Sequence, residues 1–331
     1  MRVLVLTNMF PHPGDPARGA FVSAQVDGLR DLGLAVEVLH IRGDRNMLNY
    51  ARAVGQVRRA VLAHRADVVY AFYGLSGWVA LWQSLPIVLS LAGDDILGTP
   101  NGRGGTTLKS RIGVLLSQWA AARASVVCVQ SDEMKSRLWG RGLRDRALVL
   151  PYGVDPRRFS PGARDEARSR LGIAGDELMV MFPNTPSEPR KRIDLAEMAM
   201  EVVRKTYPKA VLRVVTRVPH ATMPDYYRAA DCCLLTSDWE GSPNVVKEAL
   251  LSGVPVVSTP VGDVARWIPM SPESAIVERT PQAIAEAITK VLGSGRRVDP
   301  TPFVSAFGSR AIAERMVQLF ERTVDSRPGP A

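Results

Sequence analysis

The feature that most constrains the fold of this chain is a regular alternation between short apolar segments and longer segments with helical periodicity. In the first half, β-branched and aliphatic runs at residues 2–7, 35–40 and 67–72 are separated by helical patterns near residues 17–32 and 45–65. A strand that is apolar along its whole length is buried on both faces, as in a parallel sheet covered by helices on either side. The alternation therefore predicts a doubly wound α/β fold.

The alternation continues to residue 150, is interrupted over residues 151–175 by Pro, Gly and charged residues with one short helix among them, and then restarts. The other predicted strands are residues 86–92, 125–131, 147–150, 177–182, 210–217, 231–236, 254–259 and 274–277, and the other predicted helices are residues 106–122, 132–140, 193–206, 223–230, 243–252 and 281–293. A chain of 331 residues exceeds the usual size of one hydrophobic core. We therefore expect two domains, each with ligand-binding loops at the carboxyl ends of its parallel strands.

Charge is distributed unevenly between the two halves. Residues 1–160 contain 20 Lys and Arg against 12 Asp and Glu, a net charge of +8 out of +9 for the whole chain. This asymmetry predicts that the first domain faces an anionic partner, which could be a membrane surface, a phosphorylated acceptor or nucleic acid. The arginine-rich helical pattern near residues 45–65 could lie on anionic lipid, or it could be an ordinary helix that packs on the core. A solvated basic surface is the alternative to any such partner.

Several classes of protein are excluded by the sequence. Cys128, Cys232 and Cys233 lie in apolar runs, which predicts buried thiols rather than a disulfide, redox or zinc site. Neither half has G-x-G-x-x-G after its first strand, and G-x-x-x-x-G-K-[ST] does not occur, which argues against a nicotinamide enzyme and a P-loop ATPase. No apolar stretch is long enough to span a membrane, and the first apolar run is too short for a signal peptide. We therefore expect a cytoplasmic protein.

The loop after the first strand is rich in Pro and Gly and leads into a helix. Gly19 stands where that helix is expected to begin, so backbone amides there could approach a phosphate closely. A plain loop before a helix is the alternative.

The strongest signal for chemistry is D-W-E-G-S-P-N-V-V-K-E-A-L at residues 238–250. It follows an apolar strand, and Ser242 is a candidate N-cap with Pro243 at the first helical position. Glu240 then lies on a loop, and Glu248 lies about one and a half turns into the helix, so both carboxylates could flank the unpaired amides at one helix end. A diphosphate could rest on those amides while the carboxylates accept hydrogen bonds from sugar hydroxyls. We therefore expect a nucleotide sugar here, with a solvent-exposed helix start and two unrelated glutamates as the alternative.

Together with A-L-L-S-G-V-P-V-V-S-T-P-V-G at residues 249–262, this block resembles the E-A-x-x-x-G-x-P-V-V segment of the retaining glycosyltransferases of the GT-B fold. The resemblance is to the large glycogen-synthase-like family, glycosyltransferase family four, group 1. It implies two doubly wound, Rossmann-like domains that face each other across a cleft. Residues 1–160 would bind the acceptor and residues 161–325 the nucleotide sugar, with a last helix that could pack back on the first domain. We expect residues 326–331 to be a disordered tail.

The same resemblance implies roles for individual residues. Glu240 would contact the donor sugar and Glu248 the ribose hydroxyls, while the backbone of Gly241, Ser242, Pro243 and Asn244 would lie against the sugar and the diphosphate.

A second block, P-R-K-R-I-D-L-A at residues 189–196, is similar to the basic motif that contacts the diphosphate in this family. It assigns the diphosphate cation to Lys191. The family usually has a further Arg about six residues earlier, where this chain has Thr185, so Arg190 or Arg192 could substitute for it.

On the acceptor side, Y-G-L-S-G from Tyr73 and G-D-D-I from Gly93 resemble the family's H-x-H-Y-x-x-S-G and H-G-x-D-[IV] stretches. Tyr70, Phe72 and Ala92 stand at the positions of the family's histidines, which suggests a different acceptor geometry. Asp95 matches the Asp of the motif, and capping of a turn is an equally good interpretation of it.

The resemblance implies a metal-independent reaction at the front face of the sugar with no protein nucleophile, in which Glu240 and Lys191 carry the catalysis. We expect no cofactor, and we expect a glycan, lipid-linked or small-molecule acceptor, with a possible peripheral contact to an anionic membrane. The alternatives are a nucleotide-sugar epimerase of the same fold and a non-catalytic nucleotide-sugar-binding protein. Nucleic-acid binding is not expected, because the basic half lacks a basic motif with interleaved aromatic residues.

Overall fold

The structure is a computed structural model that describes residues 1–12, 18–42, 47–98, 106–183 and 188–326. The chain divides into two compact units, the first formed by Met1–Gly153 with Ser309–Ala331 and the second by Val154–Gly308. Most of the expected disordered tail, residues 327–331, lies outside the described residues, as do the starts of the helical patterns expected from residues 17 and 45.

The first unit is built on a six-stranded parallel sheet with the strand order β2-β1-β3-β4-β5-β6. Its strands are β1 (Arg2–Thr7), β2 (Ala35–His40), β3 (Val68–Phe72), β4 (Ile87–Ser90), β5 (Val126–Val129) and β6 (Leu148–Val149). All six strands were predicted from the apolar runs, and the parallel sheet is confirmed.

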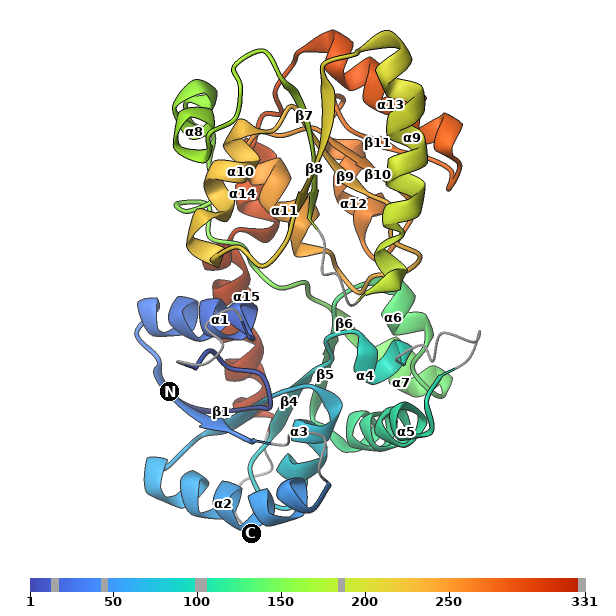
Figure 1. The fold of residues 1–331 in the computed structure, drawn as a ribbon. Coiled ribbons are helices and arrows are strands. Elements are labelled where there is room, and N and C mark those ends of the chain that lie inside the picture. The colour runs from blue at the N-terminus through green and yellow to red at the C-terminus, as the bar shows by residue number, and fades with distance from the viewer. Residues whose placement is uncertain (13–17, 43–46, 99–105, 184–187, 327–331) are drawn as a thin grey trace. The chain divides into compact units, whose positions relative to one another are not determined.

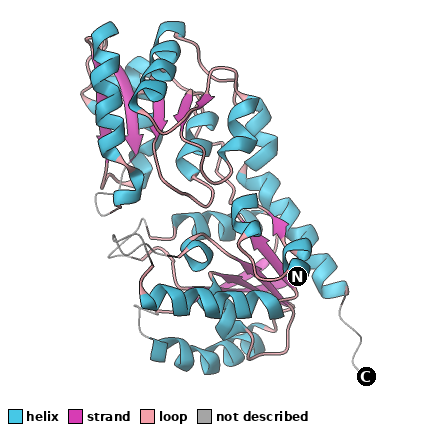
Figure 2. Ribbon diagram, turned by 90° about the vertical axis from the view of Figure 1, so that its right-hand side faces the viewer, coloured by secondary structure: helices cyan, strands magenta, loops and turns pink. Residues whose placement is uncertain are grey.

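Helices cover both faces of this sheet (Figures 1 and 2). They are α1 (Ala20–Asp31), α2 (Met47–His64), α3 (Gly74–Ala80), α4 (Asp94–Leu97), α5 (Leu108–Arg123), α6 (Asp132–Ser136), α7 (Arg141–Arg146) and α15 (Ser309–Asp325). Helices α1 and α15 pack on one face of the sheet, and α2, α3 and α5 pack on the other. The strands are buried on both sides, because alternate residues of β1 such as Leu4 and Val5 belong to different hydrophobic clusters.

The second unit is built on a five-stranded parallel sheet with the strand order β11-β10-β9-β7-β8. Its strands are β7 (Leu178–Pro183), β8 (Ala210–Val215), β9 (Cys232–Leu235), β10 (Val256–Ser258) and β11 (Ala275–Ile276). These strands also match the predicted ones. The three cysteines of the chain are free and buried, as predicted.

The helices of the second unit again lie on both faces of its sheet (Figure 2). They are α8 (Arg164–Leu171), α9 (Ile193–Thr206), α10 (Met223–Ala229), α11 (Asn244–Leu251), α12 (Val264–Trp267), α13 (Pro281–Ser294) and α14 (Thr301–Phe307), with the 3₁₀ turns η1 (Pro189–Lys191), η2 (His220–Thr222) and η3 (Ile268–Met270). Helices α9 and α13 cover one face, and α8, α10, α11 and α14 cover the other. The two-domain α/β fold with two doubly wound parallel sheets is therefore confirmed.

Candidate functional site

Two loops at the carboxyl edge of the second sheet are joined by hydrogen bonds. The Thr236 hydroxyl, just after β9, donates to the carbonyls of Lys191 and Arg192 at 2.8 and 2.9 Å. The amide of Asp238 donates to the carbonyl of Arg190 at 2.8 Å. Because β7 and β9 are adjacent and parallel, the segments that follow them meet at the same edge. The basic block and the acidic block are therefore brought together although they are about fifty positions apart in the sequence.

The Glu240 carboxylate is the centre of this junction. One oxygen lies 2.6 Å from the Lys191 ammonium and accepts a 2.9 Å hydrogen bond from the Ser237 hydroxyl, and the other lies 2.7 Å from the Arg190 guanidinium. Burial would raise the pKa of Glu240, but the nearby charges of Lys191 and Arg190 outweigh burial and lower that pKa below its usual value. Glu240 is thus a buried carboxylate that stays charged.

Arg190 has further partners on its other side. Its guanidinium lies 2.7 Å from the Glu188 carboxylate and stacks over the Trp239 ring at 4.7 Å from the ring centroid. Arg192, in contrast, adopts a left-handed conformation with φ 53° and pairs with the more exposed Asp194 and Asp238. Of the two arginines considered as substitutes for the family's missing cation, Arg190 is the one at Glu240.

The Glu248 carboxylate projects from α11 toward a second set of partners. It accepts a 2.7 Å hydrogen bond from the buried Tyr227 hydroxyl, and its other oxygen lies 3.6 Å from Nε2 of His220. Burial raises the pKa of the Cys233 thiol in β9, and the charges of both Glu248 and Lys191 act on that pKa as well. Glu248 and Lys191 therefore lie within electrostatic range of the same buried side chain.

Helix α11 begins at Asn244, with Pro243 at its N-cap position and no side-chain cap. The predictions of Ser242 as the N-cap and Pro243 as the first helical residue are therefore wrong by one position. The Ser242 hydroxyl accepts no hydrogen bond from the first amides of α11, and it donates to Oδ2 of Asp263 at 2.7 Å.

Asp263 links the start of α11 to the loop after β10. Besides the bond from Ser242, it accepts a 2.7 Å hydrogen bond from the indole of Trp267. Burial raises the pKa of Asp263, and the charge of Lys247 opposes that shift. Burial also lowers the pKa of Lys247, which is fully buried in α11, to about 8.

A buried polar atom at the start of α11 makes no hydrogen bond to the described part of the chain. Within the described residues, Oδ1 of Asn244 is buried and has no hydrogen-bond partner. Buried polar atoms are normally satisfied, so a ligand could complete the hydrogen bonding of this one.

Lys191 and Arg190 were identified from the sequence, but the other partners of the two glutamates were missed. Tyr227, Ser237 and His220 belong to no recognisable motif, and Tyr227 is 21 positions from Glu248. Asp263, the partner of Ser242, was missed as well. His220 and Tyr227 precede β9 and Glu248 follows it, so their contact depends on how α10 and α11 pack on the sheet.

In the first unit, Asp95 and Tyr73 lie together at the carboxyl edge of the sheet. The Asp95 carboxylate accepts hydrogen bonds from the amides of Gly74, Ala92 and Gly93. Burial raises the pKa of Asp95 to about 6, and these amides oppose the shift. The bonds agree with the turn-capping interpretation of Asp95. Tyr73 has φ 69°, a strained conformation for a residue with a side chain, and burial raises its pKa.

Gly19 also belongs to the first unit, and it occupies the N-cap position of α1, as expected for a residue where that helix begins. It has φ 66°, and a Cβ atom added there would collide with the carbonyl of Met9. The close approach of the two backbone segments therefore requires glycine.

Two negative findings concern the residues that the structure describes. Among them, no group of three or more His, Cys, Asp or Glu side chains is arranged to hold a metal ion. None of the helices in that part of the chain has both the length and the apolar character needed to cross a membrane.

Comparison with known families gives a match for each unit. Residues 1–153 match the family described as "Glycosyl transferase 4-like domain", and residues 182–294 match the family described as "Glycosyl transferases group 1". The second match includes η1, Glu240, α11 and Asp263.

Among sequence relatives, the Bacillus subtilis protein TuaC, whose name assigns it to teichuronic acid biosynthesis as a glycosyltransferase, is 27% identical over 88% of this chain and 89% of its own length. The D-inositol 3-phosphate glycosyltransferase of Geodermatophilus obscurus is 30% identical over 78% of this chain and 65% of its own length.

Among solved structures, the sucrose-phosphate synthase of Thermosynechococcus elongatus has a TM-score of 0.75 at 18% identity, covering 98% of this chain and all of that one. Anabaena HepE in complex with UDP and glucose has a TM-score of 0.70 at 17% identity, covering 97% and 99%. These likenesses concern the fold, which is the GT-B fold. With both units matched, the chain belongs to the group 1 glycosyltransferases of the GT-B fold.

Proposed function

We propose that this protein is a retaining glycosyltransferase that transfers a sugar from a nucleoside-diphosphate sugar without a metal ion. The observation that carries the proposal is the buried Glu240 carboxylate, held at 2.6 Å by Lys191 and at 2.7 Å by Arg190. This cluster lies at the carboxyl edge of a parallel sheet, where doubly wound folds bind their ligands. The donor would therefore bind in the second unit.

The charges of the cluster suggest how a diphosphate would enter. Arg190 and Lys191 are balanced by Glu188 and Glu240, so without a ligand each cation already has an anionic partner. A diphosphate would compete with Glu240 for Lys191. A cation about 4 Å from a phosphate charge contributes on the order of 4 kcal/mol at an effective dielectric constant of 20, before desolvation is subtracted. Once released from Lys191, the Glu240 carboxylate could accept a hydrogen bond from a hydroxyl of the donor sugar.

The start of α11 supports the same placement. The helix begins without a side-chain cap, and the backbone of Gly241, Ser242, Pro243 and Asn244 leads into it, so its first amides could bind the diphosphate. The buried Asn244 oxygen could accept a hydrogen bond from the donor. Glu248, oriented by the Tyr227 hydroxyl, would bind the ribose hydroxyls.

The reaction would proceed at one face of the sugar. The bond between the anomeric carbon and the leaving diphosphate oxygen breaks, and a bond from the same face of that carbon to the acceptor oxygen forms. The acceptor proton passes to the departing diphosphate oxygen, so neither a protein nucleophile nor a metal is needed. Lys191, Arg190 and the helix amides would stabilise the negative charge that develops on the diphosphate.

The acceptor would bind to the first unit, beside Tyr73 and Asp95. The net charge of +8 in residues 1–160 favours an acceptor that carries an acid group. The relatives' names include teichuronic acid and D-inositol 3-phosphate, which suggests a glycan, a lipid-linked sugar or a small molecule of this kind.

Other functions are less well supported. An epimerase or a binding protein of the same fold would use the same donor site, but both matched families consist of glycosyltransferases. We propose no cofactor, no nucleic-acid partner, and a cytoplasmic enzyme that works at the inner face of the membrane.

Two substitutions test the site through opposite effects on binding. We expect Lys191→Met to weaken binding of UDP, GDP or ADP at least tenfold, because a diphosphate contact is lost. Glu240→Gln should tighten binding of the same diphosphate, because Lys191 and Arg190 no longer have that carboxylate as a competitor. Both variants should lose transfer by about 100-fold or more. Isothermal titration calorimetry gives the affinities, and thermal unfolding checks the fold.

The matched control is Lys209→Met, which removes an exposed lysine of the same unit that pairs with Asp176. This variant should bind and transfer like the wild type. Transfer is assayed with radiolabelled UDP-, GDP- and ADP-sugars, with and without a cell lipid extract, and NMR of the product gives its anomeric configuration. Full activity in either site variant would contradict the proposed site, and a product with inverted anomeric configuration would contradict retention. An epimerised donor would favour an epimerase, and binding without any reaction would favour a binding protein.

A further inference from the structure

Helix α5 of the first unit carries large apolar side chains on its outer face. Leu108, Ile112, Leu115 and Trp119 have exposed fractions of 72%, 47%, 51% and 36%. At 3.6 residues per turn, these four positions fall within an arc of about 60° and form one stripe along the helix. A continuous apolar stripe on the surface of a protein marks a place where something else binds.

The inner face of α5 has the opposite character. Ser117, Gln118, Ala120 and Ala121 are its buried residues, and a Cβ atom added at Gly74 of α3 would collide with the Ser117 side chain. The helix therefore presents small and polar side chains to its own core and large apolar ones outward, which reverses the usual pattern of a surface helix. The outer stripe is not needed to hold the first unit together.

Positive charge borders the stripe on both sides. Lys109 and Arg111 are exposed and fall about 80° to either side of its centre, and the exposed Arg123 lies over the Trp119 ring at 4.1 Å from the centroid. Residues 106–123 contain no Asp or Glu. An apolar stripe flanked by cations matches the interface of an anionic bilayer, where basic side chains reach the headgroups above buried apolar ones.

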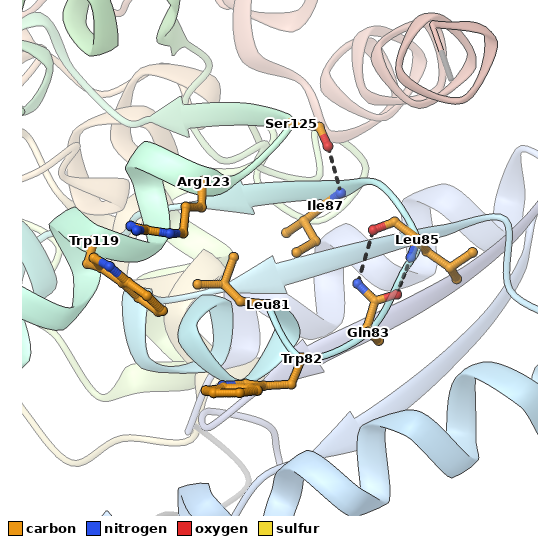
Figure 3. A pocket seen from close by; sticks show the side chains of 8 residues that line it. All are labelled: Leu81, Trp82, Gln83, Leu85, Ile87, Trp119, Arg123 and Ser125. Carbon is orange, nitrogen blue, oxygen red and sulfur yellow. Dashed lines mark hydrogen bonds between the residues drawn. The ribbon is translucent and has the colours of Figure 1, made fainter. Parts of the chain in front are cut away.

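A pocket of about 360 Å³ continues this surface at the end of α5 (Figure 3). Trp82, Trp119 and Arg123 are among the residues that line it, and Trp82 is 46% exposed. The Arg58 guanidinium donates to the carbonyl of Trp82 at 2.6 Å, which adds another cation. Tryptophan is enriched at the level of lipid headgroups because its ring is apolar and its N–H is polar.

We propose that the α5 surface, formed by Leu108, Ile112, Leu115, Trp119 and Trp82, docks on a bilayer that contains anionic lipid. The proposal rests on the proposed function, because it identifies the acceptor as one that is held at a membrane. The beginning of α5 packs beside the end of α4, where a Cβ atom added at Gly98 would lie 3.0 Å from the Thr106 side chain. Docking through α5 thus brings the sheet edge with Asp95 close to the headgroups.

The structure favours α5 over the arginine-rich helix α2 for this role. Tyr50, Ala53 and Val57 of α2 are buried in the first core, so α2 uses its apolar face inside the unit. This agrees with the interpretation of the pattern at residues 45–65 as an ordinary packing helix.

The test is co-sedimentation of the full chain with vesicles of phosphatidylglycerol and phosphatidylcholine in equal amounts. We expect the wild type to bind these vesicles at low salt, to bind pure phosphatidylcholine at least tenfold more weakly, and to dissociate as salt rises. The double variant Ile112→Ser with Leu115→Ser should lose binding at least tenfold. The control Leu62→Ser removes an equally exposed apolar residue, 77% exposed on α2, and should bind like the wild type.

A second readout identifies the face that inserts. An environment-sensitive dye on Leu115→Cys should shift to shorter wavelength with anionic vesicles, and the same dye on Met198→Cys in the second unit should not, since the native cysteines are buried. No binding by the wild type, or unchanged binding by the double variant, overturns the proposal. A concentration-dependent dimer in sedimentation velocity that the double variant abolishes, without vesicle binding, overturns it in favour of a second copy of the chain. Transfer to a soluble acceptor should be unchanged in the double variant. Vesicle binding is measured without donor or acceptor, so a protein that binds vesicles but transfers no sugar would contradict the proposed function and not the docking surface.

Discussion

Lys247 is a charged side chain without exposed surface in the middle of α11. Burial lowers its pKa from 10.5 to about 8, although Asp263 and Glu248 oppose that shift. Between pH 8 and 10.5 the unfolded chain holds a proton on Lys247 that the folded chain has released, so this group contributes a rise of the free energy of unfolding with pH across this window. The full contribution of Lys247 is about 3 kcal/mol. The thiols of Cys128, Cys232 and Cys233, whose pKa values are raised by burial, act in the opposite direction.

We therefore predict that Lys247→Met removes this contribution, so that between pH 7.5 and 9.5 its free energy of unfolding changes less favourably than that of the wild type by about 2 kcal/mol. Urea unfolding at the two pH values measures the difference, with Lys209→Met as a control that follows the wild type. The same pH dependence in Lys247→Met and in the wild type would contradict the prediction.

Gly19 gives a second prediction at the scale of one residue. Replacement by Ala places a side chain at φ 66° and against the Met9 carbonyl, so Gly19→Ala should lose at least about 2 kcal/mol of unfolding free energy. Gly55→Ala, in the open interior of α2, should instead gain about 0.5–1 kcal/mol. Urea midpoints compare the two variants, and similar effects from both would contradict the account of Gly19.

At the scale of the element, the long helices α2, α5, α9 and α13 were predicted from their periodicity, whereas several short helices were not. Helix α9 spans the predicted residues 193–206 to the residue, because its apolar positions recur at helical spacing. Helices α3, α4 and α7 have four to seven residues, which is too short for a periodic pattern to be recognised. Such helices are held by contacts from distant parts of the chain, as at Gly74, where Ser117 of α5 fills the place of a side chain.

The candidate site divides in the same way. Glu240, Lys191 and Glu248 were identifiable because they lie in contiguous motifs, and the ion pair between Glu240 and Lys191 follows from adjacent parallel strands. Ser242 was assigned as the N-cap of α11 because it precedes a proline. Its hydroxyl instead bonds to Asp263, which lies in the loop after β10 and could not be recognised as a neighbour from the sequence. Tyr227 could not be found from sequence for the same reason.

Helix α15 belongs to the first unit, although more than 150 residues of sequence separate it from the rest of that unit. Its Phe320 is fully buried and contacts Tyr70 of β3 at 5.3 Å between ring centroids. We predict that Phe320→Ala costs the first unit about 3–5 kcal/mol. Hydrogen exchange should become faster in β1 and β3 and remain unchanged in β7 and β9. Phe303→Ala, a buried residue of α14, should show the reverse pattern. Equally faster exchange in both units, from either variant, would contradict the division of the chain into two separate units.

At the scale of the whole molecule, each unit has its own hydrophobic clusters, and the clusters of the second unit lie entirely within residues 154–308. We predict that a fragment of residues 154–308 folds and binds UDP, GDP or ADP within about threefold of the full chain, because Lys191, Glu240 and Glu248 all belong to it. The same fragment should transfer no sugar, because Tyr73 and Asp95 are missing. Circular dichroism and calorimetry measure both properties, and an unfolded fragment, or one that binds more than tenfold weaker, would contradict the prediction.

The most direct test of the central claim is a crystal structure of the protein soaked with UDP, GDP or ADP, whichever raises its melting temperature most. We expect the two phosphates to lie beside Lys191 and the first amides of α11, with the ribose hydroxyls at Glu248 and the distance between Glu240 and Lys191 lengthened from 2.6 Å. A nucleotide bound elsewhere in the chain, with that distance unchanged, would contradict the central claim.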